Sequence, residues 1–340
     1  MRFPINAKSL KGMENQIIPP SPDKIYATIR NLRSQIDQFL QYLPNVTSLN
    51  YQSSQFHLQQ YIMNSFKIAR NSNEKRFFID ELFVSISLAQ LSQNTLHYLA
   101  LITTIIDIDL GDKVLKANRI ARDLLTIQPE PNPLIFQLLT TILLWLDRSL
   151  RSSMQIITNT FLETSLKFCK EQDQEKNAAG LMLWSLLLKH FPTYTENQFS
   201  EIPTIVIQSF KSQSKLVKKS ALHFIQILLN YSTPPFRRVT VSVLSELNKE
   251  IGKKEWKKYK YYIKASELII SKYPDLSSQF SFQELPLSMF NEKDIKLQKS
   301  ACLILPFIFR VAPDLFTNET INKIFTIYDT LTSKKSNVKK

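Results

Sequence analysis

Glycine is scarce in this sequence. The 340 residues contain four, at Gly12, Gly111, Gly180 and Gly252, and these stand alone and far apart. No glycine-rich loop of the kind that cradles phosphate groups can be built from them. A sheet protein of this size would need many more glycines for its turns, whereas helices need few. The scarcity therefore favours an all-α fold and argues against nucleotide chemistry.

Cysteines and long apolar runs are also lacking. Cys169 and Cys302 each lie within an apolar helical pattern, so we expect two buried small side chains and no disulfide framework. The longest apolar candidate, Leu96 to Ile106, is shorter than the roughly 18 residues that a membrane span needs. Residues 1–12 contain no hydrophobic stretch and predict no secretory signal. We expect the chain to lie in the cytosol or the nucleus.

Patterns typical of catalytic and metal sites are absent from the sequence. None of the four histidines (His57, His97, His190 and His223) has a His, Cys or Asp three or four residues away, so we predict no metal site. His223 is expected to be a hydrogen-bonded core or interface histidine. The acidic residues Asp107, Asp109 and Asp112 lack a calcium-loop pattern and predict a solvated helix end. We predict no catalytic residue and no cofactor, since the kinase motifs are also missing.

A repeated pattern is present instead. Pro192, Pro274 and Pro313 each follow three consecutive apolar residues at the same distance, with intervals of 82 and 39 residues. The three runs are residues 186–188, 268–270 and 307–309. The interval of 82 residues is about twice that of 39, so we infer a period of about 40 residues in which one weak copy of the pattern is skipped. Such a period is typical of stacked helix pairs of the HEAT or armadillo kind.

The spacing of apolar residues predicts helices along most of the chain. Asn132 is expected to cap one helix with Pro133 at its first position, and Gly111 to adopt a left-handed conformation at a helix end. The expected helices are 22–43, 54–70, 74–92, 94–108, 112–126, 133–147, 151–170, 174–190, 198–212, 214–231, 236–252, 255–273, 276–290, 292–311 and 318–333.

Three parts of the chain follow from this pattern. Residues 1–21 are expected to be irregular, and residues 334–340 to form a disordered basic tail. Between them, residues 22–333 are expected to form an α-solenoid of the HEAT or armadillo type, with about seven antiparallel helix pairs.

The chain carries a formal net charge of +14, and its basic residues are the best candidates for partner binding. The candidate residues are Lys253, Lys254, Trp256, Lys257, Lys258 and Tyr259, together with Arg237 and Arg238. A helix with a solvated lysine face explains the first cluster most simply. The alternatives are a site for an acidic protein or a phospholipid, or a nucleic-acid platform. Lysine predominates over arginine, which disfavours specific reading of phosphates or bases.

Several segments occur in an order and spacing similar to those of a known family. They are 118–125 followed by 132–134, 175–181 leading to 190–192, 205–206 through 219–222, and 296–298 through 303–306 to 312–317. Together these segments resemble the N-terminal HEAT-repeat region of the target-of-rapamycin (TOR) kinases, which belong to the phosphatidylinositol-3-kinase-related kinases. The resemblance covers roughly residues 25 to 335, although the long loop insertions common in larger members are missing.

The resemblance implies a scaffold that docks regulatory subunits and holds a dimer together, while a separate kinase domain carries out phosphorylation. Our first hypothesis is therefore a non-enzymatic, protein-binding scaffold in growth or nutrient signalling, with subunits of a TOR-like complex as partners. The alternative is a stand-alone HEAT-repeat adaptor, for nuclear transport or the cytoskeleton, that binds acidic proteins. We expect no membrane span and no nucleic-acid partner.

Overall fold

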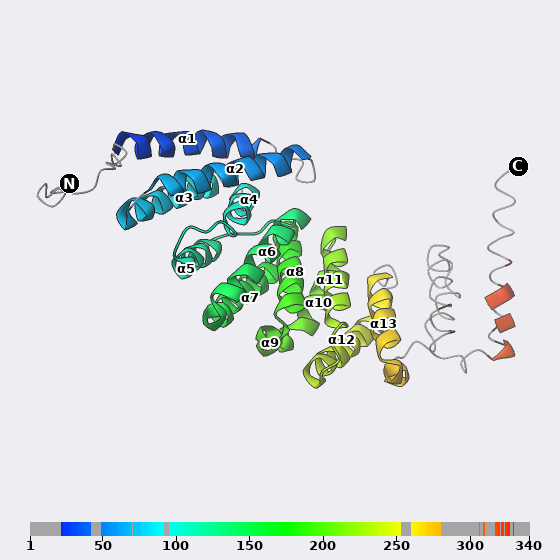
Figure 1. The fold of residues 1–340 in the computed structure, drawn as a ribbon. Coiled ribbons are helices and arrows are strands. Elements are labelled where there is room, and N and C mark those ends of the chain that lie inside the picture. Colours follow the sequence, from blue (N-terminus) through cyan, green and yellow to red (C-terminus); the bar gives the residue numbers. More distant parts are fainter. Residues whose placement is uncertain are drawn as a thin grey trace, which may run out of the picture. The chain divides into compact units, whose positions relative to one another are not determined.

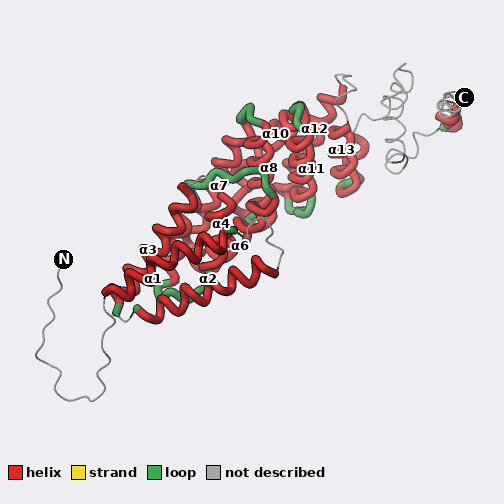
Figure 2. The backbone as a smooth tube through the Cα atoms, turned by 90° about the horizontal axis from the view of Figure 1, so that it is seen from above, coloured by secondary structure: helices red, strands yellow, loops and turns green. Residues whose placement is uncertain are grey.

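The computed structural model describes residues 22–41, 49–69, 71–91, 95–252 and 260–279, and positions 306, 309, 317–319, 321, 322, 324–326 and 329. Within these residues every regular element is a helix and no strand occurs (Figures 1 and 2). The all-α prediction is therefore confirmed. The chain divides into two compact units, Met1–Ile120 and Ala121–Lys340, and the division falls within helix α5.

The first unit is built around a short apolar helix, α4. Its elements are α1 (Pro22–Leu40), α2 (Leu49–Ile68), α3 (Ser72–Leu91), α4 (Thr95–Ile105) and α5 (Lys113–Leu124). Helix α4 packs against α2 and α3, and α1 also packs against both. The largest side chain of α4, Tyr98, is fully buried, as are its neighbours Leu99 and Ile102. Burial of apolar surface around α4 therefore holds this unit together.

The second unit contains two rows of helices. In one row α8 lies beside α11 and α11 beside α13, and in the other α10 lies beside α12 (Figure 1). The elements are α6 (Pro133–Ser149), α7 (Met154–Lys170), α8 (Gln174–His190), α9 (Pro192–Thr195), α10 (Ile202–Lys211), α11 (Lys215–Leu228), α12 (Pro234–Gly252) and α13 (Lys260–Lys272), with 3-10 turns η2 (Arg151–Ser153), η3 (Glu196–Glu201) and η5 (Pro274–Gln279).

Aromatic side chains fill the core of the second unit. Trp184 of α8 is fully buried, and its ring centroid lies 5.1 Å from that of Phe224 on α11. Phe210 of α10 meets Tyr262 of α13 edge to face, with 5.5 Å between the ring centroids. The first pair joins neighbours within one row and the second joins the two rows, so large rings anchor the packing in both directions.

Polar caps begin several helices, one of them where the sequence predicts it. Asn132 precedes α6 and accepts a hydrogen bond from the Leu134 backbone N–H at 3.0 Å, with Pro133 at the first helical position. Asp173 caps α8 in the same way through the backbone N–H groups of Glu175 and Lys176. Gly111 has a φ of +90°, in the left-handed region that favours glycine.

Some predicted helix bounds differ from the structure: the helix predicted over 54–70 begins at Leu49, and two other differences involve proline. In the range 198–212 the α-helix begins later than predicted: residues up to Glu201 form a 3-10 turn, and α10 begins at Ile202 with Pro203 in its first turn. Proline lacks a backbone N–H, which favours the start of a helix over its interior. The range 276–290 was expected to begin an α-helix, but residues up to Gln279 form a 3-10 turn that starts at Pro274.

Helices α7 and α8 approach each other very closely at Gly180. The Ser165 hydroxyl donates to the Gly180 carbonyl oxygen at 2.7 Å, and the Asn177 side-chain amide donates to the Cys169 carbonyl oxygen at 2.7 Å. A Cβ atom at Gly180 would lie 2.7 Å from the Ser165 carbonyl oxygen and 2.8 Å from the Cys169 backbone nitrogen. The missing side chain is thus what allows these two backbones to meet.

In the described part of the chain, no single helix has the length and apolar character needed to cross a bilayer. The segments Pro133–Ser149 and Arg151–Lys170 would pass such a test together, but they are bent by 113° relative to each other.

Candidate functional site

Two of the predicted partner-binding residues belong to the part of the chain that the structure describes, and the other six do not. Lys253, Lys254, Trp256, Lys257, Lys258 and Tyr259 lie outside the described residues. Arg237 and Arg238 lie in the first half of α12, and both are exposed.

The two arginines of α12 differ in their surroundings. The Arg237 guanidinium forms an ion pair with the Asp275 carboxylate and lies 5.5 Å from the ring centroid of Tyr273. Arg237 therefore connects α12 to η5 within the second unit. For Arg238 the described contact is through its backbone, whose carbonyl oxygen accepts a hydrogen bond from the Ser242 hydroxyl at 3.1 Å. Arg238 is thus the better placed of the two for contact with a partner.

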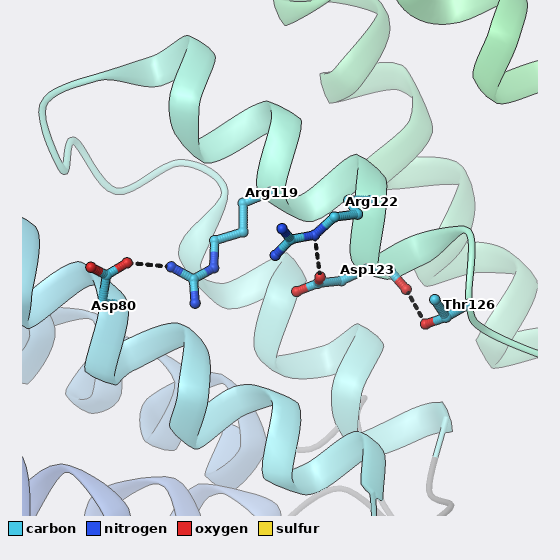
Figure 3. Close-up of polar contacts among 5 residues, drawn as sticks. All are labelled: Asp80, Arg119, Arg122, Asp123 and Thr126. Atoms are coloured by element: carbon cyan, nitrogen blue, oxygen red, sulfur yellow. Dashed lines mark hydrogen bonds and ion pairs between the residues drawn. The ribbon is translucent and has the colours of Figure 1, made fainter.

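Ion pairs like that of Arg237 recur at nearly constant sequence separation. Arg119 of α5 pairs with Asp80 of α3 at 2.5 Å, across 39 residues (Figure 3). Lys211 of α10 pairs with Glu250 of α12 at 3.0 Å, also across 39 residues. The pair in α12 and η5 spans 38 residues. Each pair is partly exposed and contributes little stability alone. The ion pair between Lys170 of α7 and Glu201 of η3 spans a shorter separation of 31 residues.

A chain of tyrosine hydrogen bonds has a similar separation. The Tyr231 hydroxyl donates to the Lys189 carbonyl oxygen at 2.8 Å, and the Tyr273 hydroxyl donates to the Tyr231 carbonyl oxygen at 3.2 Å. Both bonds span 42 residues. They link the ends of α8, α11 and α13, the three helices that form one row.

One hollow in the first unit is a groove of about 560 Å³ that we call the α3–α5 groove. Most of its lining comes from one face of α3 and one face of α5. The lining residues are Phe66, Ser72, Lys75, Arg76, Ile79, Asp80, Phe83, Leu110, Gly111, Asp112, Leu115, Lys116 and Arg119. The groove combines apolar and basic side chains.

Two cations of the α3–α5 groove lie against aromatic rings. The Lys75 ammonium is 5.5 Å from the ring centroid of Phe66, and the Arg119 guanidinium is 4.7 Å from that of Phe83. Arg119 is additionally held by Asp80, whereas Arg76 is exposed on α3. The rings position the basic groups without neutralising their charge.

Beyond Arg119, two further contacts close the C-terminal end of α5. The Arg122 guanidinium lies 3.5 Å from the Asp123 carboxylate, and the Thr126 hydroxyl donates to the Asp123 carbonyl oxygen at 2.7 Å (Figure 3). The Arg122 side chain is 74% exposed, so this ion pair is weak. The same Asp123 carbonyl oxygen also accepts a hydrogen bond from the Thr126 backbone N–H at 3.2 Å, so Thr126 pairs with it twice at the helix end.

Lys116 is a buried cation at the base of the α3–α5 groove. Its ammonium donates to the carbonyl oxygens of Ile105, Ile106 and Ile108 at 3.3, 2.9 and 2.6 Å, and so closes the C-terminal end of α4. Burial lowers the pKa of Lys116 to about 8, while the charges of Asp107 and Asp109 oppose that shift. Lys116 therefore has a structural role in the first unit.

Two of the acidic residues around Gly111 form hydrogen bonds with nearby backbone N–H groups. Asp109 accepts a hydrogen bond from the Gly111 N–H at 3.0 Å, and Asp112 caps α5 by accepting one from the Leu115 N–H at 2.9 Å. Asp107, Asp109 and Asp112 are all exposed, as predicted for a solvated helix end. Among the described residues, no group of three His, Cys, Asp or Glu side chains is arranged to hold a metal ion.

A second groove, of about 290 Å³, lies in the other unit between α6, α8 and α11. It is lined in part by Lys189, His190 and His223. Burial and the charge of Lys189 lower the pKa of His190. His223 was expected to be a core or interface histidine, and the core assignment is wrong: its side chain is exposed, because it shares the solvent face of α11 with Leu216, Lys219 and Gln226 at three-and-four spacing.

A third hollow, of about 580 Å³, lies between α1 and α2 in the first unit and is mainly polar. Gln35, Gln38, Ser54 and His57 contribute to its lining. The described lining carries amides and hydroxyls but no carboxylate or lysine, so it offers neither a strong charge nor a deep apolar anchor.

Cys169 is buried, as predicted, at 2% exposure, and burial raises the pKa of its thiol to about 12. The thiol is therefore protonated at neutral pH and has little nucleophilic character. Cys302 lies outside the described residues.

No protein-family model and no curated protein matches this sequence.

Sequence reasoning missed the α3–α5 groove, although part of its signal is visible. Residues 72, 75, 76, 79, 80 and 83 follow the three-and-four spacing of one helix face, and this face mixes cations with Ile79 and Phe83. This mixed basic and apolar face of α3, which lies outside the densest lysine cluster, was the sequence signal that indicated a binding groove. The partner face, on α5, depends on how the two helices meet and has no comparable signal.

Proposed function

We propose that this chain is a protein-binding scaffold built as an α-solenoid of the HEAT type. The observation that carries the proposal is the recurrence of contacts between equivalent helices at 38, 39 and 42 residues. Stacked helix pairs of about 40 residues produce such offsets, because each unit contacts its neighbours in the same way. The side-by-side order of α8, α11 and α13 supports the same arrangement.

Binding along extended faces is the mechanism that fits such an array. Several large apolar side chains in the described helices face solvent, among them Ile156 at 67%, Val114 at 54% and Leu115 at 51% exposure. The described hollows between these helices combine polar and apolar groups. These features support recognition of other proteins along the helical faces.

The finer form of the proposal is a scaffold equivalent to the N-terminal HEAT region of a TOR-type kinase, which docks regulatory subunits. It is supported by the ordered segments of the sequence, from Asn118–Leu125 to Ala312–Thr317. The absence of kinase motifs in the 340 residues is consistent with such a region, since phosphorylation in that family belongs to a different domain.

A second candidate is a stand-alone adaptor for acidic proteins. The specific observation in its favour is the basic character of the α3–α5 groove, together with the net charge of +14. Like the first candidate, it is a binding protein, but its partners would be defined by charge.

Two measurements test these proposals. Tagging the gene at its natural locus, purifying the protein and crosslinking it should recover stoichiometric partners with crosslinks to the described helices. Recovery of the chain alone at both low and high salt would contradict the scaffold proposal. Reading the gene beyond Lys340 separates the two candidates: further repeats and a kinase domain support the TOR-type scaffold, and a stop codon supports the adaptor.

A further inference from the structure

We propose that the α3–α5 groove binds an amphipathic helix of a partner protein that carries acidic residues beside an apolar face. This inference rests on the proposed scaffold function and gives it a site and a partner chemistry.

The shape of the groove is the first argument. Lys75, Ile79 and Phe83 lie on one face of α3, and Leu115 and Arg119 on one face of α5. Lys75 lies over Phe66 near the start of α3, and a methyl group at Gly111, just before α5, would lie 3.9 Å from the same ring. At the other end Arg119 meets Asp80 (Figure 3). The two helices therefore run in the same direction and border a linear groove, which suits a helical segment.

The floor of the groove is apolar. Phe83 and Leu110 are buried at its base, with 0% and 3% exposure, and Ile79 and Phe66 are half-buried. Leu115 lies at the edge with 51% of its surface exposed. An apolar anchor from a partner would cover Leu115 and fill the space above the floor.

Charge defines the partner. The lining contains four basic residues and two acidic ones. Arg119 and Asp80 form an ion pair, and the Lys116 ammonium donates its hydrogen bonds to the carbonyl oxygens at the end of α4. Lys75 and Arg76 remain exposed on α3, opposed by Asp112 alone among the lining residues. A partner with carboxylates beside its apolar face complements this arrangement.

The same features favour a peptide over a nucleic acid. Two exposed cations are too few to neutralise the phosphates of a nucleic-acid backbone. The aromatic rings of the groove already contact its own cations, at 5.5 and 4.7 Å from the ring centroids, and are therefore not free to stack with bases. The exposed leucine and the apolar floor instead match the side chains of a protein helix.

The test uses the full chain and three fluorescein-labelled probes in an anisotropy titration. The first probe is a short helical peptide with leucines on one face and glutamates on its flanks. The second has the same leucines with lysine flanks, and the third is a single-stranded oligonucleotide. We expect the acidic peptide to bind best, and its affinity to fall as salt is raised.

Charge reversal provides the decisive comparison. Lys75→Glu/Arg76→Glu should weaken binding of the acidic peptide about tenfold, or about 1.4 kcal/mol, and strengthen binding of the lysine-flanked peptide. Leu115→Ser should weaken both peptides. Lys215→Glu/Lys219→Glu, which reverses two exposed lysines of α11, is the matched control and should change neither result. Circular dichroism checks that each variant is folded.

Equal affinity of the acidic peptide for the wild type and the Lys75→Glu/Arg76→Glu variant would overturn the proposal. So would stronger binding of the oligonucleotide than of the acidic peptide, or an equal loss in the α11 control. These outcomes concern the groove alone. Recovery of natural partners crosslinked to other helices would keep the scaffold function, whereas loss of all partners would reject that function independently of the peptide result.

Discussion

Tyr273 donates its hydroxyl hydrogen to the backbone carbonyl oxygen of Tyr231 at 3.2 Å, across 42 residues of sequence. Tyr231 in turn donates to the carbonyl oxygen of Lys189 at 2.8 Å. Lys189 lies in the last turn of α8, where carbonyl groups lack partners within the helix. The two tyrosines thus connect the ends of three neighbouring helices.

Removal of either hydroxyl should destabilise the second unit. We expect Tyr231→Phe and Tyr273→Phe each to lower the free energy of unfolding by about 1 kcal/mol, because a carbonyl oxygen loses its donor while the ring is retained. Urea unfolding followed by circular dichroism measures the change. Tyr194→Phe is the control, since it removes a hydroxyl outside this hydrogen-bonded chain and keeps the ring contact with Phe191. Equal losses in all three variants would contradict the assigned role.

Gly180 should tolerate no side chain. Gly180→Ala would place a Cβ atom 2.7 Å from the Ser165 carbonyl oxygen, so α7 and α8 must separate. We expect a loss of about 1 to 3 kcal/mol in the free energy of unfolding, although alanine favours helix formation.

Gly111→Asn is the comparison for Gly180→Ala. Asparagine tolerates the left-handed conformation, and the nearest atom to a Cβ at Gly111 is 3.9 Å away. Thermal melting should therefore show a much smaller change. A melting temperature of Gly180→Ala equal to that of the wild type would contradict the close approach of the two backbones.

Lys116→Met should destabilise the first unit by leaving the carbonyl oxygens at the end of α4 without their donor. We expect a loss of about 1 to 3 kcal/mol, measured by chemical denaturation at pH 7. Lys113→Met, which alters an exposed lysine of the same helix, should have little effect.

The difference between wild type and Lys116→Met should also depend on pH. Burial lowers the pKa of Lys116 from 10.5 to about 8 in the folded protein. Between these values the unfolded chain holds a proton that the folded chain has released, so the stability of the wild type rises with pH relative to the variant. Below pH 8 the difference should be constant. A relative stability of the wild type that falls from pH 8 to pH 10 would contradict the shift.

Leu187→Asp should unfold the second unit locally. Leu187 of α8 is fully buried, so the new carboxylate would lie among apolar side chains at a cost of several kcal/mol. Ile156→Asp on α7 is the control, since Ile156 is 67% exposed and its replacement should change the melting temperature little. A wild-type melting curve for Leu187→Asp would be incompatible with this core.

Helix positions were predictable where local chemistry decides them. The predicted range 174–190 coincides with α8, since Asp173 caps its start and the chain turns after His190 into Pro192. Asn132 with Pro133 likewise fixes the start of α6. Such signals depend on a few neighbouring residues and need no tertiary contact.

The sequence pattern of prolines was recognised only in part. Pro234 stands at the first position of α12, 42 residues after Pro192, where the skipped copy was expected. It was missed because Asn230 occupies the place of the third apolar residue in the run that begins at Leu228. Asn230 is exposed, so the interruption of the pattern is confined to the end of a helix and leaves the core intact.

The candidate site could not be predicted because it depends on distances between helices. Arg119 and Asp80 lie 39 residues apart, and no local pattern pairs them. The same holds for His223, whose exposure follows from the rotation of α11 rather than from its apolar neighbours. The densest basic cluster, residues 253–259, lies outside the described residues and stays a prediction.

The tyrosine hydrogen bonds give the row of helices a polarity. Each tyrosine hydroxyl donates to a carbonyl oxygen at the end of the preceding helix in the row. The carbonyl oxygen of Tyr231 therefore needs Tyr273 as its donor, whereas the hydrogen bond from Tyr231 to Lys189 does not involve Tyr273. Opening of α8 or of α13 breaks one of these two bonds, whereas displacement of Tyr231 at the end of α11 breaks both. Hydrogen exchange along this row is therefore expected to be slowest in α11.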